Sequence, residues 1–290
     1  MFYNLIFGTL RIQRTIPTIS TTIASLYMLG ITDFSVIFSL SLSIFFFHIS
    51  ASAFNDLSDI NADQINSPER ILIMGSISHS QLTILSTVLF LIGGFISLRL
   101  DLFYGIMALT FGLLYILLYS FFIPMKSNPI GSFLYLSFSG FSIPFIAALI
   151  ITQNITYYTL LFSFVLFIFG SCATLSAIKD IIGDSKVNKN TFAVSLGFNK
   201  SKILVSFFIL FPILLYPFIY FVFNFSSSIL YLALFPITIR ILLSHKLITV
   251  SNPLNLFKYS SLYRFSRAST YSLIVLDALI LALTKPLIWL

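Results

Sequence analysis

The chain has 290 residues, of which 58% are hydrophobic and only 9% are charged, and its mean hydropathy is +1.02. A soluble domain carries about 25% charged residues, so this composition excludes an ordinary water-soluble enzyme or regulatory domain. The single cysteine, Cys172, excludes an intramolecular disulfide and any zinc site built on several cysteines. We therefore expect an all-α, polytopic integral membrane protein in which residues 1–290 form one domain.

Apolar segments close to the length that crosses a bilayer, about 20 residues, recur along the chain. We expect nine transmembrane helices, at residues 16–31, 35–54, 82–98, 102–123, 132–152, 157–178, 203–223, 228–243 and 270–288. The longest polar connections follow even-numbered spans, so they lie on one side of the membrane. These connections cover residues 55–81, 179–202 and 244–269.

The basic residues are distributed very unequally between the two sides that this topology defines. One side has only Arg99 and Lys285. The other side has Arg11, Arg14, Arg70, Lys126, Lys179, Lys186, Lys189, Lys200, Lys202, Arg240, Lys246, Lys258, Arg264 and Arg267. Because basic loops stay in the cytoplasm, the second side is expected to be cytoplasmic. The net charge of +7 follows from this asymmetry, and no nucleic-acid partner is needed to explain it.

A cluster of acids follows the second expected span, in the stretch NDLSDINADQINSPER at residues 55–70. If the helix continues beyond the span, Asn55, Asp59 and Asp63 lie one turn apart on one face, with Asp56 beside them. Like charges spaced four residues apart destabilise a helix, so this stripe requires a compensating cation. Carboxylate and amide oxygens are ligands for Mg²⁺, Mn²⁺ or Ca²⁺.

A second acidic stretch, at residues 177–197, follows the sixth expected span on the same side and places Asp180 and Asp184 four residues apart. Mg²⁺ takes one or two carboxylates and completes its shell with water and phosphate. Two facing stripes can therefore hold two metal ions around one diphosphate. Basic residues interleave with the acids and can neutralise a leaving diphosphate, namely Arg70, Lys126, Lys179, Lys186 and Lys189.

Two ionisable residues lie inside expected spans, His48 in the second and Asp277 in the last. An ionisable group at membrane depth is a functional candidate by default. For His48, a place beside the site and a hydrogen-bonded packing role both stay open. For Asp277, the alternative to a functional role is an ion pair with Arg264 or Arg267.

The pattern N-D-x2-D-x3-D-x2-N-x-P-x-R and the later D-x3-D resemble the motifs of the UbiA superfamily of intramembrane prenyltransferases. The resemblance covers essentially the whole chain, because RIQRTIP (11–17) and YSFFIPMKSNPIG (119–131) also look like family segments. The matching motif residues are Asn55, Asp56, Asp59, Asp63, Asn66, Pro68, Arg70, Asp180, Asp184, Thr191 and Gly197.

The resemblance implies a helical bundle around a central cavity, in which two Mg²⁺ ions bridged by an isoprenoid diphosphate face the cytoplasm. The diphosphate ionises to an allylic cation, which an acceptor captures. The implied metal ligands are Asn55, Asp59, Asp63, Asp180 and Asp184. The implied catalytic residues are Asp56, Arg70 and Lys126, and the diphosphate ligands are Arg14, Arg70, Lys126 and Lys179. Membrane lipid is the remaining partner, and no obligate protein partner is evident.

Within the family, the chain looks most like archaeal digeranylgeranylglyceryl phosphate synthases, which transfer a geranylgeranyl group to geranylgeranylglyceryl phosphate in ether-lipid synthesis. It departs from the family pattern at RILIMGS (70–76), which lacks two prolines, at Ala177, where many members have an aspartate, and at NTFAV (190–194). These departures leave two alternatives open, prenylation of an aromatic quinone precursor and terpene cyclisation.

Two other classes of membrane protein fit the acidic residues less well. A CDP-alcohol phosphotransferase would need a D-G-x2-A-R core, which this sequence lacks. A transporter would place its acids near the bilayer midplane, within broken helices. Here the acids gather at the ends of spans instead.

Overall fold

The computed structural model describes residues 12–68, 70–117, 125–251 and 261–284, and the regular structure in this part of the chain is entirely helical. Helices satisfy their own backbone hydrogen bonds, as lipid requires of a spanning segment. The elements are η2 (Ile12–Arg14), α1 (Thr15–Met28), α2 (Phe34–Ser58), α3 (Ile60–Asn66), α4 (His79–Leu100), α5 (Leu102–Ile116), η4 (Met125–Ser127), α6 (Pro129–Gly140), α7 (Ser142–Thr152), α8 (Tyr157–Gly170), η5 (Ser171–Thr174), α9 (Leu175–Lys179), α10 (Ile181–Lys186), α11 (Phe192–Leu210), α12 (Pro212–Val222), α13 (Ser228–Leu232), α14 (Leu234–Thr249) and α15 (Ser261–Leu283).

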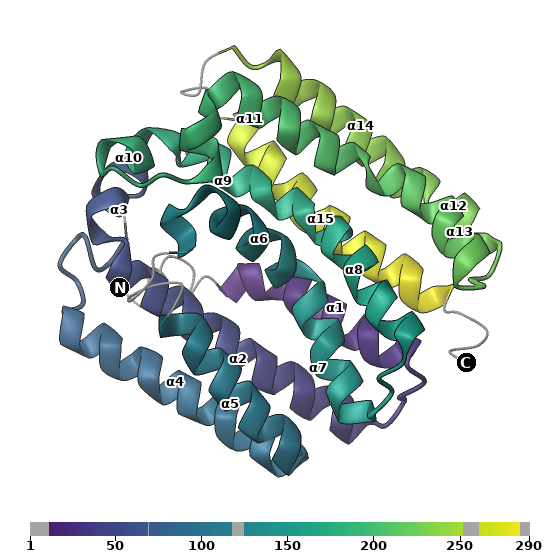
Figure 1. The fold of residues 1–290 in the computed structure, drawn as a ribbon. Coiled ribbons are helices and arrows are strands. Elements are labelled where there is room, and N and C mark those ends of the chain that lie inside the picture. Colours follow the sequence, from purple (N-terminus) through teal and green to yellow (C-terminus); the bar gives the residue numbers. More distant parts are fainter. Residues whose placement is uncertain (1–11, 69, 118–124, 252–260, 285–290) are drawn as a thin grey trace.

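The long helices form a bundle in which α4 and α5 lie at one edge and α14 lies at the opposite edge (Figure 1). Helix α2 packs against α4, α1 packs against α15, and α11 packs against α14. The short helices α3 and α10 pack against each other at one end of the bundle, next to α9. This end of the bundle contains both acidic stretches.

Side-chain caps fix where the long helices begin. The carboxylates of Asp33 and Asp101 accept hydrogen bonds from backbone amides in the first turns of α2 and α5. Ser78 caps α4 in a reciprocal capping box, and Thr191 caps α11. Such caps satisfy amides that have no partner within the helix.

The nine expected spans all overlap helices, but the number of helices that cross the membrane is not established. Five helical segments are long and apolar enough to cross a membrane: Phe34–Ser58, His79–Leu100, Tyr157–Lys179, Phe192–Val222 and Ser228–Thr249. The pair α6 and α7 makes a sixth if it is one span bent by 56°. Residues 118–123 of the fourth expected span and 285–288 of the ninth lie outside the described residues. The expected count of nine stays a prediction.

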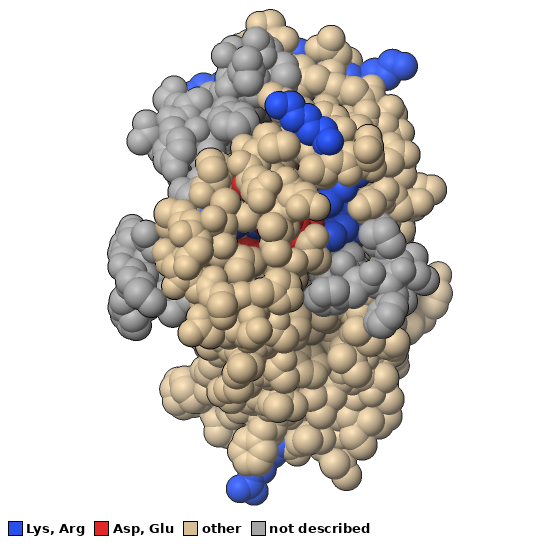
Figure 2. Space-filling model, turned by 90° about the vertical axis from the view of Figure 1, so that its left-hand side faces the viewer, with Lys and Arg blue, Asp and Glu red and all other residues tan. Residues whose placement is uncertain are grey.

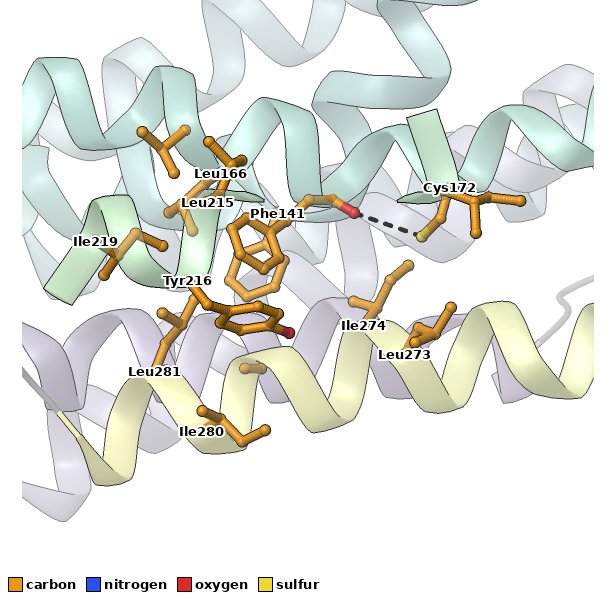
Figure 3. Close-up of a cluster of buried hydrophobic side chains, with 14 of the residues drawn as sticks. Phe141, Leu166, Cys172, Leu215, Tyr216, Ile219, Leu273, Ile274, Ile280 and Leu281 are labelled. Atoms are coloured by element: carbon orange, nitrogen blue, oxygen red, sulfur yellow. Dashed lines mark hydrogen bonds between the residues drawn. The ribbon is translucent and has the colours of Figure 1, made fainter. Parts of the chain in front are cut away.

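The largest cluster of buried side chains joins the helices of the second half of the chain (Figure 3). Tyr216 from α12 lies against Phe169 from α8, edge to face, with ring centroids 5.3 Å apart. Cys172 is fully buried in this cluster, and its thiol donates to the carbonyl oxygen of Phe169 over 3.4 Å. Cys172 therefore acts as a small packing residue, as its apolar sequence context indicates.

A charged pair lies inside the same core, where Arg240 from α14 contacts Asp277 from α15. Both side chains are fully buried, and the hydroxyl of Tyr216 donates to the same carboxylate. The cluster lies beside Pro212 at the start of α12, which has no N–H to donate to the carbonyl four residues earlier. Ser171 donates to that carbonyl, at residue 208, over 3.4 Å, and the Arg240 guanidinium donates to the next one, at residue 209, over 3.0 Å.

This arrangement corrects two expectations. Arg240 is a core residue and does not contribute to the charge asymmetry at the membrane surface. Asp277 pairs with Arg240 and not with Arg267, because Arg267 is ten residues away on the same helix, about 15 Å along its axis.

Replacing Asp277 by Ala should destabilise the fold by about 3–5 kcal/mol, because it leaves the Arg240 guanidinium buried without its counter-charge. The free energy of unfolding in detergent micelles measures the effect. The double variant Arg240→Met with Asp277→Leu should recover part of the loss. Asp33→Asn, an exposed position, is the matched control. A loss below about 1 kcal/mol for Asp277→Ala would show that the pair is not needed.

Candidate active site

The first acidic stretch spans a junction between two helices. Helix α2 ends at Ser58 and α3 begins at Ile60, with Asp59 between them. The amide of Asp59 donates to the carbonyl of Asn55 over 3.0 Å, and the amide of Asp63 donates to the carbonyl of Asp59 over 2.8 Å. The expected one-turn spacing is thus preserved, although the stripe lies on two consecutive helices and not on one.

The second acidic stretch has the same construction. Asp180 stands between α9 and α10, and the amide of Asp184 donates to the carbonyl of Asp180 over 3.0 Å. Aspartate favours such junctions because its short side chain competes with backbone hydrogen bonds inside helices. Each stretch therefore presents two carboxyl groups one turn apart.

Arg70 contacts two carboxylates of the first stretch. Its guanidinium lies 2.9 Å from Asp56 and also contacts Asp63. Asp56 and Asp63 are both buried, and Arg70 is largely buried. Removing ions from water costs several kcal/mol each, so these carboxylates depend on a close cationic partner.

Asp59 is held by lysines from two other parts of the chain. The ammonium of Lys126 lies 2.7 Å from its carboxylate, and Lys189 contacts the same oxygen. The amide of Asn55 also donates to this carboxylate over 3.0 Å. Burial raises the pKa of Asp59, but the two ammonium groups outweigh burial and hold this pKa below its usual range.

The segment MKSNPIG (125–131) places Lys126 beside the acids. Asn128 caps α6 by accepting from the amides of residues 130 and 131, and Pro129 occupies the first helical turn. A Cβ atom on Gly131 would overlap the carbonyl of Met125, so only glycine lets the preceding turn fold back onto the helix. Burial lowers the pKa of Lys126, against the opposing effect of the Asp59 carboxylate.

The Asp184 carboxyl lacks comparable neutralisation. Burial and the neighbouring Asp180 carboxylate raise its pKa to about 7, and Lys189 opposes this shift only in part. The Asp59 carboxylate is close enough to raise the pKa of Asp184 further, so acids of the two stretches interact with each other. The Asp180 carboxylate itself pairs with Lys179 over 2.9 Å.

Figure 2 shows one face of the molecule, on which acidic surface is visible only in small recessed areas near the centre, beside basic side chains. Most of the surrounding surface is uncharged. Buried carboxylates with basic side chains around them are suited to a small polyanion that brings its own cations.

The structure brings nine of the ten expected site residues into one cluster, linked by ion pairs, side-chain and backbone hydrogen bonds, and electrostatic interactions. The tenth, Arg14, is half-buried just before α1, and its place in the site stays a prediction. Sequence reasoning named Lys189 only among the basic residues that can neutralise a diphosphate, and Asn66 only as a motif residue, and it predicted neither of their contacts. Lys189 follows Asp184 by five residues, and its amide donates to the Asp184 carbonyl over 2.9 Å, so this spacing was the available signal.

The donor set fits Mg²⁺ only together with a phosphate ligand. Within the described residues, no three carboxylate, imidazole or thiol groups converge as they would in a site built from protein ligands alone. Mg²⁺ needs only one or two carboxylates when substrate phosphate and water supply the rest. Burial first, and then the neighbouring carboxylates, raise the pKa of Asp184, and a divalent cation bound beside it would favour its ionised form.

Residues 16–265 match the UbiA prenyltransferase family, and the chain belongs to this family. It is therefore a membrane-embedded prenyltransferase. A named relative is the digeranylgeranylglyceryl phosphate synthase of Sulfolobus acidocaldarius, which is 32% identical over 198 residues, covering 67% of this chain and 70% of the relative.

Solved structures show the same fold. A UbiA homologue from Archaeoglobus fulgidus bound to GPP and Mg²⁺ aligns with a TM-score of 0.69 at 14% identity, over 94% of this chain and 98% of that one. The same homologue bound to DMAPP and Mg²⁺ gives a TM-score of 0.68 at 14% identity, with the same coverage. A solved structure of digeranylgeranylglyceryl phosphate synthase aligns with a TM-score of 0.58 at 20% identity, over 97% of this chain and 96% of that one.

In metal-free protein, the Asp184 carboxyl should titrate near pH 7. Below this pH the group is protonated and above it the group is ionised, so a protonated-carboxyl infrared band should disappear between about pH 6 and pH 8. Because the unfolded state ionises near pH 4, this group should also make the fold less stable as the pH rises from 4 to 7. Asp184→Asn should abolish the band, and Asp33→Asn should leave it unchanged. A band that survives Asp184→Asn would contradict the assignment.

Proposed function

We propose that this prenyltransferase moves a geranylgeranyl group from its diphosphate to geranylgeranylglyceryl phosphate, in the synthesis of ether lipids. The observation that supports diphosphate chemistry most strongly is the pair of acidic helix junctions that face each other, with basic residues bonded to their carboxylates. The choice of acceptor rests on the 32% identical relative, which is named as a digeranylgeranylglyceryl phosphate synthase.

The proposal assigns the metal ions to the oxygen donors of the two junctions. Two Mg²⁺ ions would be held by Asn55, Asp59, Asp63, Asp180 and Asp184, with the substrate diphosphate as a bridging ligand. When bound, these ions neutralise the diphosphate and make it a better leaving group. The UbiA homologue structures with GPP and Mg²⁺ and with DMAPP and Mg²⁺ support this pairing of ligands.

The basic side chains would stabilise the leaving group. The bond between C1 of the prenyl group and the diphosphate oxygen breaks, and negative charge builds on the diphosphate. Lys126 and Arg70 already lie within the acidic cluster, and charge-assisted hydrogen bonds from them to phosphate are strongest where water is excluded. Arg14 and Lys179 would add charge at its rim, and Asp56 would keep Arg70 oriented.

The acceptor completes the reaction. Its hydroxyl oxygen forms the new bond to C1 of the prenyl cation, and its proton leaves with the diphosphate or to water. The apolar prenyl tail would lie among the helices of the bundle, where burial of each CH₂ group contributes about 0.8 kcal/mol to binding. An aromatic acceptor would be attacked at a ring carbon, and a cyclase would use no acceptor.

We further propose that this site faces the cytoplasm. With Arg240 assigned to the core, thirteen of the sixteen basic residues still fall on the expected cytoplasmic side and two fall on the other. This ratio supports the orientation through the positive-inside rule. It also places the charged substrates on the side where soluble diphosphates are available.

Purified protein supplied with geranylgeranyl diphosphate, Mg²⁺ and geranylgeranylglyceryl phosphate should release pyrophosphate and form the doubly prenylated lipid. Asp59→Asn and Asp184→Asn should each lower kcat more than about 100-fold, since even second-sphere partners of a metal are worth about 10- to 100-fold. Asp33→Asn, which removes a charge at the opposite end of α2 and preserves the cap, should be unchanged. Full activity of Asp59→Asn would refute the metal assignment.

The same assay with a panel of acceptors tests the acceptor. Prenylation of an aromatic quinone precursor in place of the glycerol phosphate lipid would reassign the substrate. Release of pyrophosphate with a cyclic hydrocarbon and no prenylated product would identify a cyclase. Either result would contradict the proposed acceptor and leave the diphosphate site intact.

A further inference from the structure

One neutral side chain joins the two acidic stretches directly. Asn66 is the last residue of α3, three residues after Asp63, and it is buried. Its amide nitrogen donates to the carbonyl of Asp180 over 3.2 Å, and its amide oxygen accepts from the backbone N–H of Gly183 over 3.0 Å. Both bonds cross from the first acidic stretch to the second.

The partner residue is shaped for this contact. A Cβ atom at residue 183 would overlap the side-chain amide of Asn66, so any residue but glycine would displace that amide from its two hydrogen bonds. Gly183 lies in α10 directly before Asp184, and the carbonyl that Asn66 binds belongs to Asp180. The contact therefore holds the backbone that carries both acids of the second stretch.

A second contact between the stretches has a different character. Lys189 pairs with Asp59, and both of these groups are charged, so a bound diphosphate and its cations would compete for each of them. Asn66 is neutral, and both of its partners are backbone groups. Its two hydrogen bonds can persist when the site is filled.

We propose that Asn66 is a positioning residue that sets the separation of the two acidic stretches and thereby the affinity of the site for Mg²⁺ and diphosphate. The inference rests on the proposed diphosphate site. Asn66 itself contacts backbone and is not assigned a place on metal or substrate. Its effect is indirect, as with groups that orient metal ligands from the second coordination sphere.

The test measures, by calorimetry on the full chain in detergent, how the binding of inorganic pyrophosphate depends on the Mg²⁺ concentration. Asn66→Ala should raise the Mg²⁺ concentration at half-saturation by about 10-fold or more. The matched control is Asn61→Ala, because Asn61 lies on the same short helix and is exposed. It should bind as the wild type does. Thermal unfolding of each variant, measured in parallel, reports stability separately from affinity.

A second variant tests the geometry of the contact. Gly183→Ala should weaken binding to a similar extent as Asn66→Ala, because its methyl group displaces the Asn66 amide. In the double variant, the methyl group enters the space that Asn66 vacates. The Mg²⁺ concentration at half-saturation of the double variant should therefore be no higher than that of the single variant that binds more weakly. Such non-additivity is expected of residues in contact.

Three outcomes overturn the inference. An Asn66→Ala protein with the wild-type Mg²⁺ dependence shows that the contact does not set affinity. Effects of Asn66→Ala and Gly183→Ala that multiply in the double variant show that the two residues act independently. Wild-type protein that binds no pyrophosphate with Mg²⁺ removes the proposed diphosphate site, and the inference with it. Wild-type protein that binds pyrophosphate with Mg²⁺ but does not prenylate geranylgeranylglyceryl phosphate would instead count against the proposed acceptor alone.

Discussion

The mutual repulsion of buried carboxylates is the constraint on which the organisation of this protein depends. Asp59 and Asp184 are far apart in sequence, yet they interact across one site at the end of the bundle. Such a cluster is unfavourable unless cations offset it. In this structure Arg70, Lys126 and Lys189 do so by direct ion pairs. The same basic groups are therefore available to a diphosphate that arrives with its own metal ions.

Buried charges in the core of the bundle also need partners, but they are arranged differently. Arg240 and Asp277 are fully buried away from the acidic stretches, and their charges are matched one to one. The Arg240 guanidinium also donates to the carbonyl of residue 209, near Pro212. The pair has no net charge for a ligand to offset. At the acidic stretches the charges are shared and not matched in pairs, because Arg70 contacts both Asp56 and Asp63, and Asp59 contacts both Lys126 and Lys189.

The sequence predicted the all-helical fold, the two acidic stretches and their meeting, because hydropathy and one-turn spacing are local properties. It did not predict the breaks at Asp59 and Asp180, since both stretches read as continuous helix. It also did not predict that Asp277 pairs with Arg240, because Arg240 comes from another helix and lies within an apolar segment. The contact between Asn66 and Gly183 joins residues 117 positions apart, and only tertiary packing brings them together.

The central claim is that the two acidic junctions together hold metal ions only around a diphosphate. Electron paramagnetic resonance of Mn²⁺, used in place of Mg²⁺, tests it by counting the ions bound per chain with and without pyrophosphate. The account predicts two tightly bound ions with pyrophosphate, far weaker binding without it, and loss of the pair in the Asp59→Asn and Asp184→Asn variants. Two ions bound equally well without pyrophosphate, or retained in both variants, would contradict it.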